Sequence, residues 1–267
     1  MKVFLVMFHL LMSTFFGGGI ILAVSGHFKG EWTKFLRCFI PGWKWITMLW
    51  FIPLIALILM ASHLYPWDGF HGHKATYFSI YYLLARQVVY IAALFIAYHY
   101  LKTKPWVSLY IYFVVGTFFS YDWALILETK WFSNLYGFIY LASGALGALS
   151  VMLLTPIAPM EHERRDLVHL YVAISLFWLY LEFCQFLIVW MGNLPREVSW
   201  YVIRLQGTML VLFIAVPLLK VIPGIILACS PKLKTKETLI NICMWISLLG
   251  LVLEMVWFIW PSIKGGI

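Results

Sequence analysis

Long runs of apolar residues, separated by short polar segments, dominate the chain. A helix needs about 20 apolar residues to cross a bilayer, whereas strands of a membrane barrel alternate in segments of about ten. The continuous runs predict an all-α polytopic membrane protein, a bundle of about eight transmembrane helices. A short interfacial stretch around residues 200–206 could precede the seventh. The expected spans are residues 3–25, 44–63, 76–101, 106–126, 132–156, 167–192, 208–229 and 239–260.

The loops between these spans are too short to form a folded domain, so no soluble domain is expected. Residues 1–267 are therefore interpreted as a single transmembrane helical domain, with any chemistry placed in the bundle or in a partner. The first span could imitate a secretory signal that ends at Ala23-Val24-Ser25. Its apolar stretch is longer than a usual signal core, and we expect a retained helix.

Composition supports the membrane class. The chain is 63% hydrophobic and only 11% charged, which leaves too little polar surface for a soluble protein of this size. Aromatic residues make up 19%, as expected where Trp and Tyr concentrate at membrane interfaces.

The net charge of +8 indicates orientation rather than nucleic-acid binding, because no folded basic domain accompanies it. Cytoplasmic loops are enriched in Lys and Arg. With eight spans, the odd-numbered loops should be cytoplasmic and both termini periplasmic, which suits a multi-pass protein of a bacterial inner membrane. The odd-numbered loops hold Lys29, Lys34, Arg37, Lys102, Lys104, Arg164, Arg165, Lys232, Lys234 and Lys236; the opposite side holds Lys2, Lys74, Lys130, Arg196, Arg204 and Lys264.

Glu182 lies near the middle of the sixth span, with no basic residue nearby in sequence. An acid at mid-membrane costs about 2.5–3.5 kcal/mol on insertion scales, so it should face protein, water or a proton path. Ser175, Trp178 and Gln185 recur with it at steps of three and four residues, which places them on one helical face. Two interpretations stay open: a hydrogen-bonded seam between helices, or a proton-handling site.

Other ionisable residues lie inside expected spans. Arg86 in the third span should have an acidic or carbonyl partner, and Glu182 or Glu254 could neutralise it. Lys220 in the seventh span could instead extend along its stem toward an interface.

Two acids lie among aromatic residues around the loop between the fourth and fifth spans, Asp122 near the end of the fourth span and Glu128 in the loop. One interpretation is a capped turn anchored by Trp123 and Trp131, and the other is a proton entry or exit on the outer side. The candidate members of a proton path are Asp122, Glu128, His169, Glu182, Arg86 and Glu254.

Metal and haem ligands form no strong motif. The cysteines lack a Cys-x-x-Cys pair and are expected to be packing residues. Paired histidines could hold a haem, and His71-Gly72-His73 with Asp68 could hold a metal, but both are weak alternatives. We expect no metal and no redox cofactor in this chain. The cysteines are Cys38, Cys184, Cys229 and Cys243, and the histidines in the spans are His9, His99 and His169.

A quinone site in this chain is a weaker possibility. Quinone carbonyls need one or two hydrogen-bond donors in an apolar cleft. Gln185, Tyr180 or His169 could supply them, although polar and aromatic residues at helical spacing more often serve packing.

Several strings of residues, spread along most of the chain, follow the order of the same strings in a known family. They are residues 120–123 (Ser-Tyr-Asp-Trp) with Glu128 and 131–133 (Trp-Phe-Ser), 177–185, 190–195 (Trp-Met-Gly-Asn-Leu-Pro) with Glu197, Trp200, Tyr201 and Arg204, and 253–257; weaker similarity covers 30–32 with Arg37, 63–67 and 86–90. Together these strings resemble the F subunit of bacterial alternative complex III. That family often has Pro and His where this chain has Thr129-Lys130, and two acids where it has Arg196-Glu197. The chain also looks shorter than typical members.

The resemblance implies a cofactor-free membrane subunit of a quinol-oxidising respiratory complex, related in fold to polysulfide-reductase-type membrane subunits. In that family a homologous membrane subunit is the likelier quinol binder, while haem c and iron–sulfur clusters reside on a multihaem cytochrome and an iron–sulfur protein. This chain would then be a structural partner and a possible proton conduit, without a catalytic residue of its own. The alternatives are a transporter or channel that uses the same buried charges, and a purely structural assembly subunit.

Overall fold

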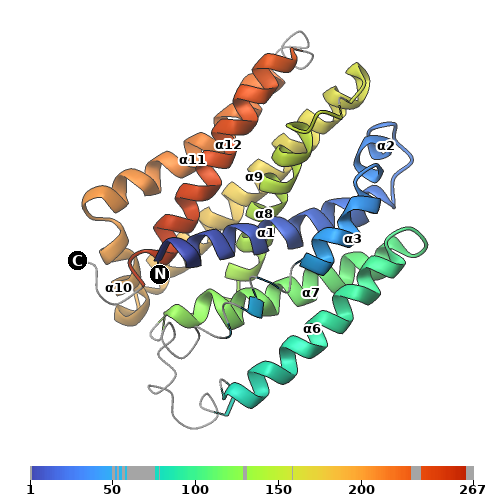
Figure 1. Cartoon of the computed structure of the whole chain (residues 1–267). Helices are drawn as coiled ribbons and strands as arrows, with labels where there is room; N and C mark the ends of the chain where they lie inside the picture. The colour runs from blue at the N-terminus through green and yellow to red at the C-terminus, as the bar shows by residue number, and fades with distance from the viewer. Residues whose placement is uncertain are drawn as a thin grey trace.

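The computed structural model describes residues 2–49, 79–128, 131–157, 159–229 and 236–262, with positions 52, 54, 55, 58, 76 and 77. Seven helices in this part are long and apolar enough to cross a membrane (Figure 1), which confirms an all-α polytopic membrane bundle. Half of the second expected span, 44–63, lies outside the described residues. The seven are α1 (Lys2–Ser25), α6 (Ile80–Tyr100), α7 (Pro105–Trp123), α8 (Tyr136–Leu153), α9 (Glu161–Gly192), α11 (Gly207–Ala228) and α12 (Glu237–Ile259).

Shorter helices connect or flank these spans. The interfacial stretch expected before the seventh span is a separate helix, α10, which begins at a proline and ends before α11. Proline suits the first turn of a helix because the amide it lacks would have no partner there. The short elements are α2 (Trp32–Arg37), α3 (Ile40–Leu49), the 3-10 helix η2 (Leu125–Leu127) and α10 (Pro195–Arg204).

Helix α7 runs antiparallel to both α1 and α6. Phe8 near the start of α1 packs against Phe119 near the end of α7, with ring centroids 6.0 Å apart. Arg86 in the first half of α6 pairs with Asp122 near the end of α7. Helices α1 and α6 are therefore parallel.

Both ends of the described chain lie on the same side of the bundle (Figure 1). The Lys2 ammonium nitrogen lies 5.0 Å from the ring centre of Trp260, just beyond the end of α12.

Close contact between α1 and α8 depends on glycine. A Cβ atom at Gly144 of α8 would lie 1.9 Å from the carbonyl oxygen of Ser13, and one at Gly17 of α1 would lie 2.1 Å from the backbone nitrogen of Ala145. Small residues allow transmembrane helices to approach closely and gain packing energy without a hydrophobic driving force. The three consecutive glycines of α1, Gly17 to Gly19, therefore allow close contact with neighbouring elements. They do not break α1, which remains one continuous helix.

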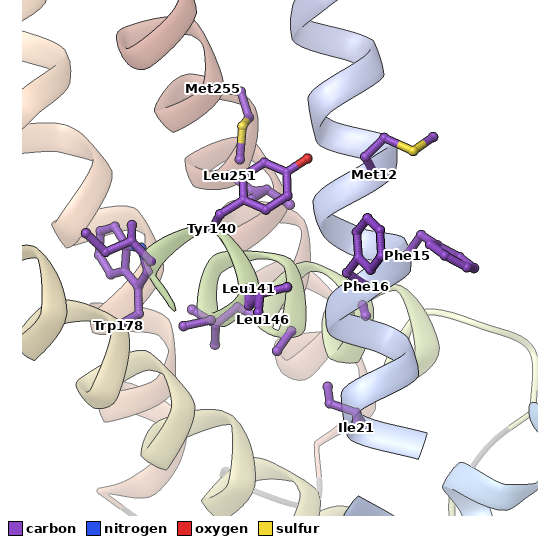
Figure 2. Close-up of a cluster of buried hydrophobic side chains, with 14 of the residues drawn as sticks. Met12, Phe15, Phe16, Ile21, Tyr140, Leu141, Leu146, Trp178, Leu251 and Met255 are labelled. Carbon is purple, nitrogen blue, oxygen red and sulfur yellow. The ribbon is translucent and has the colours of Figure 1, made fainter. Parts of the chain in front are cut away.

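The remaining helices pack around this pair. Figure 2 shows side chains of α1 and α8 meeting Leu251 and Met255 of α12, with Trp178 of α9 on the opposite flank of α8. Helix α11 packs against α9 and α12. The polar site described below lies where α8, α9, α11 and α12 come together.

Candidate functional site

Helix α9 turns the polar face predicted around Glu182 toward the protein. Ser175, Trp178 and Gln185 are buried, as the three- and four-residue spacing predicts. Tyr180, on the opposite side, is 61% exposed. The predicted polar face of this span is therefore confirmed, and it directs Glu182 toward neighbouring helices.

The centre of the site is an ion pair between Lys220 of α11 and Glu254 of α12. Lys220 is completely buried, so its stem does not carry the ammonium group to a membrane interface. The ammonium also donates a hydrogen bond of 2.6 Å to the Ser143 hydroxyl of α8 and lies 3.9 Å from the centre of the Trp178 ring. Side chains from four helices thus meet at the buried ammonium group of Lys220.

Both oxygens of the Glu254 carboxylate accept hydrogen bonds. The Trp178 indole donates to Oε1 at 2.9 Å, while Lys220 and the Ser143 hydroxyl both donate to Oε2. A buried charge is tolerated when it is paired and its remaining hydrogen-bonding capacity is satisfied. Glu254 meets both conditions.

Glu182 supplies a second carboxyl group beside this pair. It lines two cavities together with Glu254, and no hydrogen bond to its carboxyl group is found among the described residues. One ammonium neutralises one carboxylate, which leaves a surplus acid among Lys220, Glu254 and Glu182. In apolar surroundings an unpaired carboxyl group is stable in its neutral form. The cluster is therefore suited to hold one exchangeable proton.

The larger of the two cavities, which we call the lateral pocket, has a volume of about 200 Å³. It lies between α9, α11 and α12, with the two carboxyl groups as its acidic lining. The other lining residues are Trp178, Leu179, Phe183, Phe186, Leu212, Phe213, Val216, Pro217 and Trp257.

The smaller cavity, of about 20 Å³, extends from the carboxyl groups toward Trp131 and Trp200. A cavity needs roughly 10–15 Å³ to hold a water molecule. Among the described residues, the buried indole nitrogens of Trp131 and Trp200 find no hydrogen-bond partner. A water in this cavity could accept from an indole N–H and link it toward Glu182.

A second ion pair joins Arg204 of α10 to Glu128. It lies at the end of the bundle toward which the smaller cavity extends. Arg204 is 1% exposed and donates to the Glu128 carboxylate at 2.6 Å, the Phe258 carbonyl at 2.9 Å and the Ser262 hydroxyl at 2.7 Å. Its guanidinium also lies 3.9 Å from the Trp200 ring centre. Burial lowers the pKa of Arg204, although Glu128 opposes that shift.

A third ion pair joins Arg86 of α6 to Asp122 of α7, with Nε 3.0 Å from Oδ2. Arg86 also donates to the Tyr77 carbonyl at 2.7 Å. The expectation of an acidic or carbonyl partner is confirmed, whereas the suggested pairing with Glu182 or Glu254 is wrong. The Asp122 carboxylate accepts two further bonds, from Tyr90 at 2.8 Å and Tyr77 at 3.1 Å.

The six proton-path candidates thus fall into separate groups. Glu182 and Glu254 share a site, whereas Glu128 lines a separate cavity that has Trp131 and Trp200 in common with the smaller cavity at that site. Asp122 and Arg86 pair with each other between α6 and α7. His169 is exposed on α9. Lys220, which the sequence marks as a charge inside an apolar span, belongs to the first group, whereas Ser143 and Arg204 carried no distinctive sequence signal for their roles.

The three suggested quinone ligands have different surroundings. Gln185 accepts a hydrogen bond from Ser133, whereas Tyr180 and His169 are exposed on α9. His9 is buried beside Tyr140, and His99 is exposed at the end of α6. Within the described ranges, no three His, Cys, Asp or Glu side chains are grouped to hold a metal ion. The motif with Asp68, His71 and His73 lies outside those ranges.

Comparison with known proteins adds no assignment, because neither a model of a known protein family nor a curated protein matches the chain.

Proposed function

We propose that this chain is a membrane subunit of a quinol:electron-acceptor oxidoreductase of the alternative complex III type, and that the Lys220–Glu254–Glu182 cluster handles protons in it. The chain would carry no redox cofactor, and electrons would pass through the haems and iron–sulfur clusters of its partners. It would serve as structural partner of a homologous quinol-binding subunit. The sequence resemblance supports the respiratory assignment, and the cluster supports the proton role.

The observation that carries the proton role is the presence of two carboxyl groups around one fully buried ammonium inside apolar helices. A seam between helices needs only one balanced pair. The extra carboxyl group of Glu182 can release a proton and take it up again, with Lys220 nearby to stabilise the charged form. A carboxyl group in such surroundings is suited to proton exchange.

A route to the outer face would start at Glu128 and Arg204, pass the stacked rings of Trp131 and Trp200, and reach Glu182 through the small cavity that these rings line. With the termini on the periplasmic side of a bacterial inner membrane, this end of the bundle would face the periplasm. Protons would then exchange between the cluster and that side. Asp122 and Arg86 would stabilise the contact between α6 and α7.

A transporter or channel is the second class of function for buried intramembrane charges. Broken helices are one of its expected signs. Pro217 and Pro223 lie inside α11, which nevertheless runs as one helix from Gly207 to Ala228. The respiratory proposal therefore has the stronger support, from the sequence strings.

Purification of the tagged chain in mild detergent tests the proposal, with mass spectrometry of its partners and a visible absorption spectrum. The proposal expects a multihaem cytochrome and an iron–sulfur protein to co-purify, together with a haem c spectrum. A colourless protein that purifies alone would contradict it and favour the transporter.

A further inference from the structure

The lateral pocket has the size and shape to receive a substituted ring. Its volume of about 200 Å³ exceeds the roughly 150 Å³ of an apolar cavity that admits benzene. Five aromatic side chains line it, so a flat ring could stack against its walls. These side chains are Trp178, Phe183, Phe186, Phe213 and Trp257.

One polar group in the lining is available to a ligand. The Glu254 oxygens are occupied by Trp178, Lys220 and Ser143, and the Trp257 indole donates to the Arg204 carbonyl at 3.4 Å. Glu182 has no such bond among the described residues. As a neutral acid, its carboxyl group can donate to a carbonyl oxygen or accept from a hydroxyl group.

The lateral pocket reaches the outer surface of α9, a helix long and apolar enough to cross a membrane. Phe183 on its rim is 58% exposed on the outer surface of α9. A ligand would therefore enter from the hydrocarbon layer, so it must be lipid-soluble. Apolar walls with a single orienting polar group are typical of small-molecule sites.

We propose that the lateral pocket binds the headgroup of a membrane-soluble quinone, with Glu182 bonded to a ring oxygen. The earlier candidates Gln185, Tyr180 and His169 have no part in this site. The proposal does not depend on membership of a respiratory complex. It adds a binding site to a chain whose proposed role places quinol oxidation on another subunit.

Photolabelling of the purified full-length protein, with whatever subunits accompany it, tests this site. The probe is an azidoquinone, and labelled peptides are identified by mass spectrometry. Labelling should fall on the α9 and α11 segments 178–186 and 212–217. Duroquinone should compete at least fivefold more effectively than durene, which has the same ring and methyl groups without the oxygens. Labelling elsewhere, or equal competition by durene, would overturn the proposal; equal competition would indicate an apolar site for lipid chains.

Two pairs of variants distinguish binding in the lateral pocket from binding elsewhere on the chain. Leu212→Trp fills the pocket and should reduce labelling at least fivefold, whereas Leu210→Trp, on an exposed position of the same helix, should leave it unchanged. Glu182→Leu should weaken duroquinone competition at least fivefold, and Glu182→Gln, which keeps a donor and an acceptor, should retain it within about twofold. Equal labelling of the two tryptophan variants would overturn the proposal. If any of these variants misfolds, the comparison of duroquinone with durene on the unchanged protein still tests the proposal.

Discussion

Lys220 of α11 and Glu254 of α12 form an ion pair inside the membrane-spanning bundle, with Lys220 completely buried. The pair is held by Ser143 of α8 and Trp178 of α9, so it joins four helices. Its position beside Glu182 makes it both a structural element and part of the proposed proton site.

Lys220→Met should strongly destabilise the protein. Loss of the ammonium leaves Glu254 without its counter-charge, and breaking a buried pair from one side costs about 3–5 kcal/mol. Thermal unfolding of the detergent-solubilised protein measures the effect.

The control for that prediction is the double variant Lys220→Met with Glu254→Gln. It removes both charges, and a neutral pair costs less than one isolated charge, so it should unfold at a higher temperature than Lys220→Met alone. A double variant as unstable as the single one would show that the two residues are not coupled.

Gly144→Ala should disrupt the contact between α1 and α8. The new methyl group would lie 1.9 Å from the Ser13 carbonyl oxygen, so the helices must separate. Overpacking of this kind costs about 1–3 kcal/mol or more. The matched control is Gly42→Ala in α3, because a Cβ there meets no atom within 4 Å. Equal thermal stability of the two variants would contradict this account of the contact.

Arg204→Lys should destabilise the end of the bundle at Glu128 although it conserves charge. The guanidinium bonds Glu128, Ser262 and the Phe258 carbonyl while it lies over a ring, which a single ammonium cannot reproduce. We expect a loss of about 1.5–3 kcal/mol, the range for hydrogen bonds to charged groups. Arg196→Lys, at an exposed position of the same helix, should change little, and a similar loss in both would refute the assignment.

The apolar runs predicted the membrane-spanning helices because their length is set by bilayer thickness, and helical spacing predicted the buried face of α9. The partners of the buried charges were less predictable. Arg86 and Asp122 are 36 positions apart, and Lys220 and Glu254 are 34 apart, so their pairing depends on which helices are neighbours. A hydrophobic pattern fixes the faces of each helix but not its neighbours.

The environment of Lys220 could not be read from the sequence for the same reason. A lysine in an apolar span can extend to an interface or be neutralised in place, and only the position of Glu254 on the adjacent helix decides. Ser143 and Ser133 likewise look like ordinary small residues until the structure places their hydroxyl groups beside Glu254 and Gln185.

Reporter fusions test the proposed orientation. A fusion after Ser262 should give active alkaline phosphatase and dark green fluorescent protein, because the C-terminal side is proposed to be periplasmic. A fusion at Thr103, between α6 and α7, should give the reverse. The opposite pattern at both sites would place the Glu128–Arg204 end on the cytoplasmic side and reverse the proposed route.

The most direct test of the proton role is the ratio of protons translocated to electrons transferred in the complex purified with Glu182→Gln. The amide retains the size and hydrogen-bonding capacity of the neutral acid but cannot release a proton. The account predicts intact assembly with a lowered ratio, whereas intact assembly with an unchanged ratio would contradict it and make Glu182 part of a structural seam.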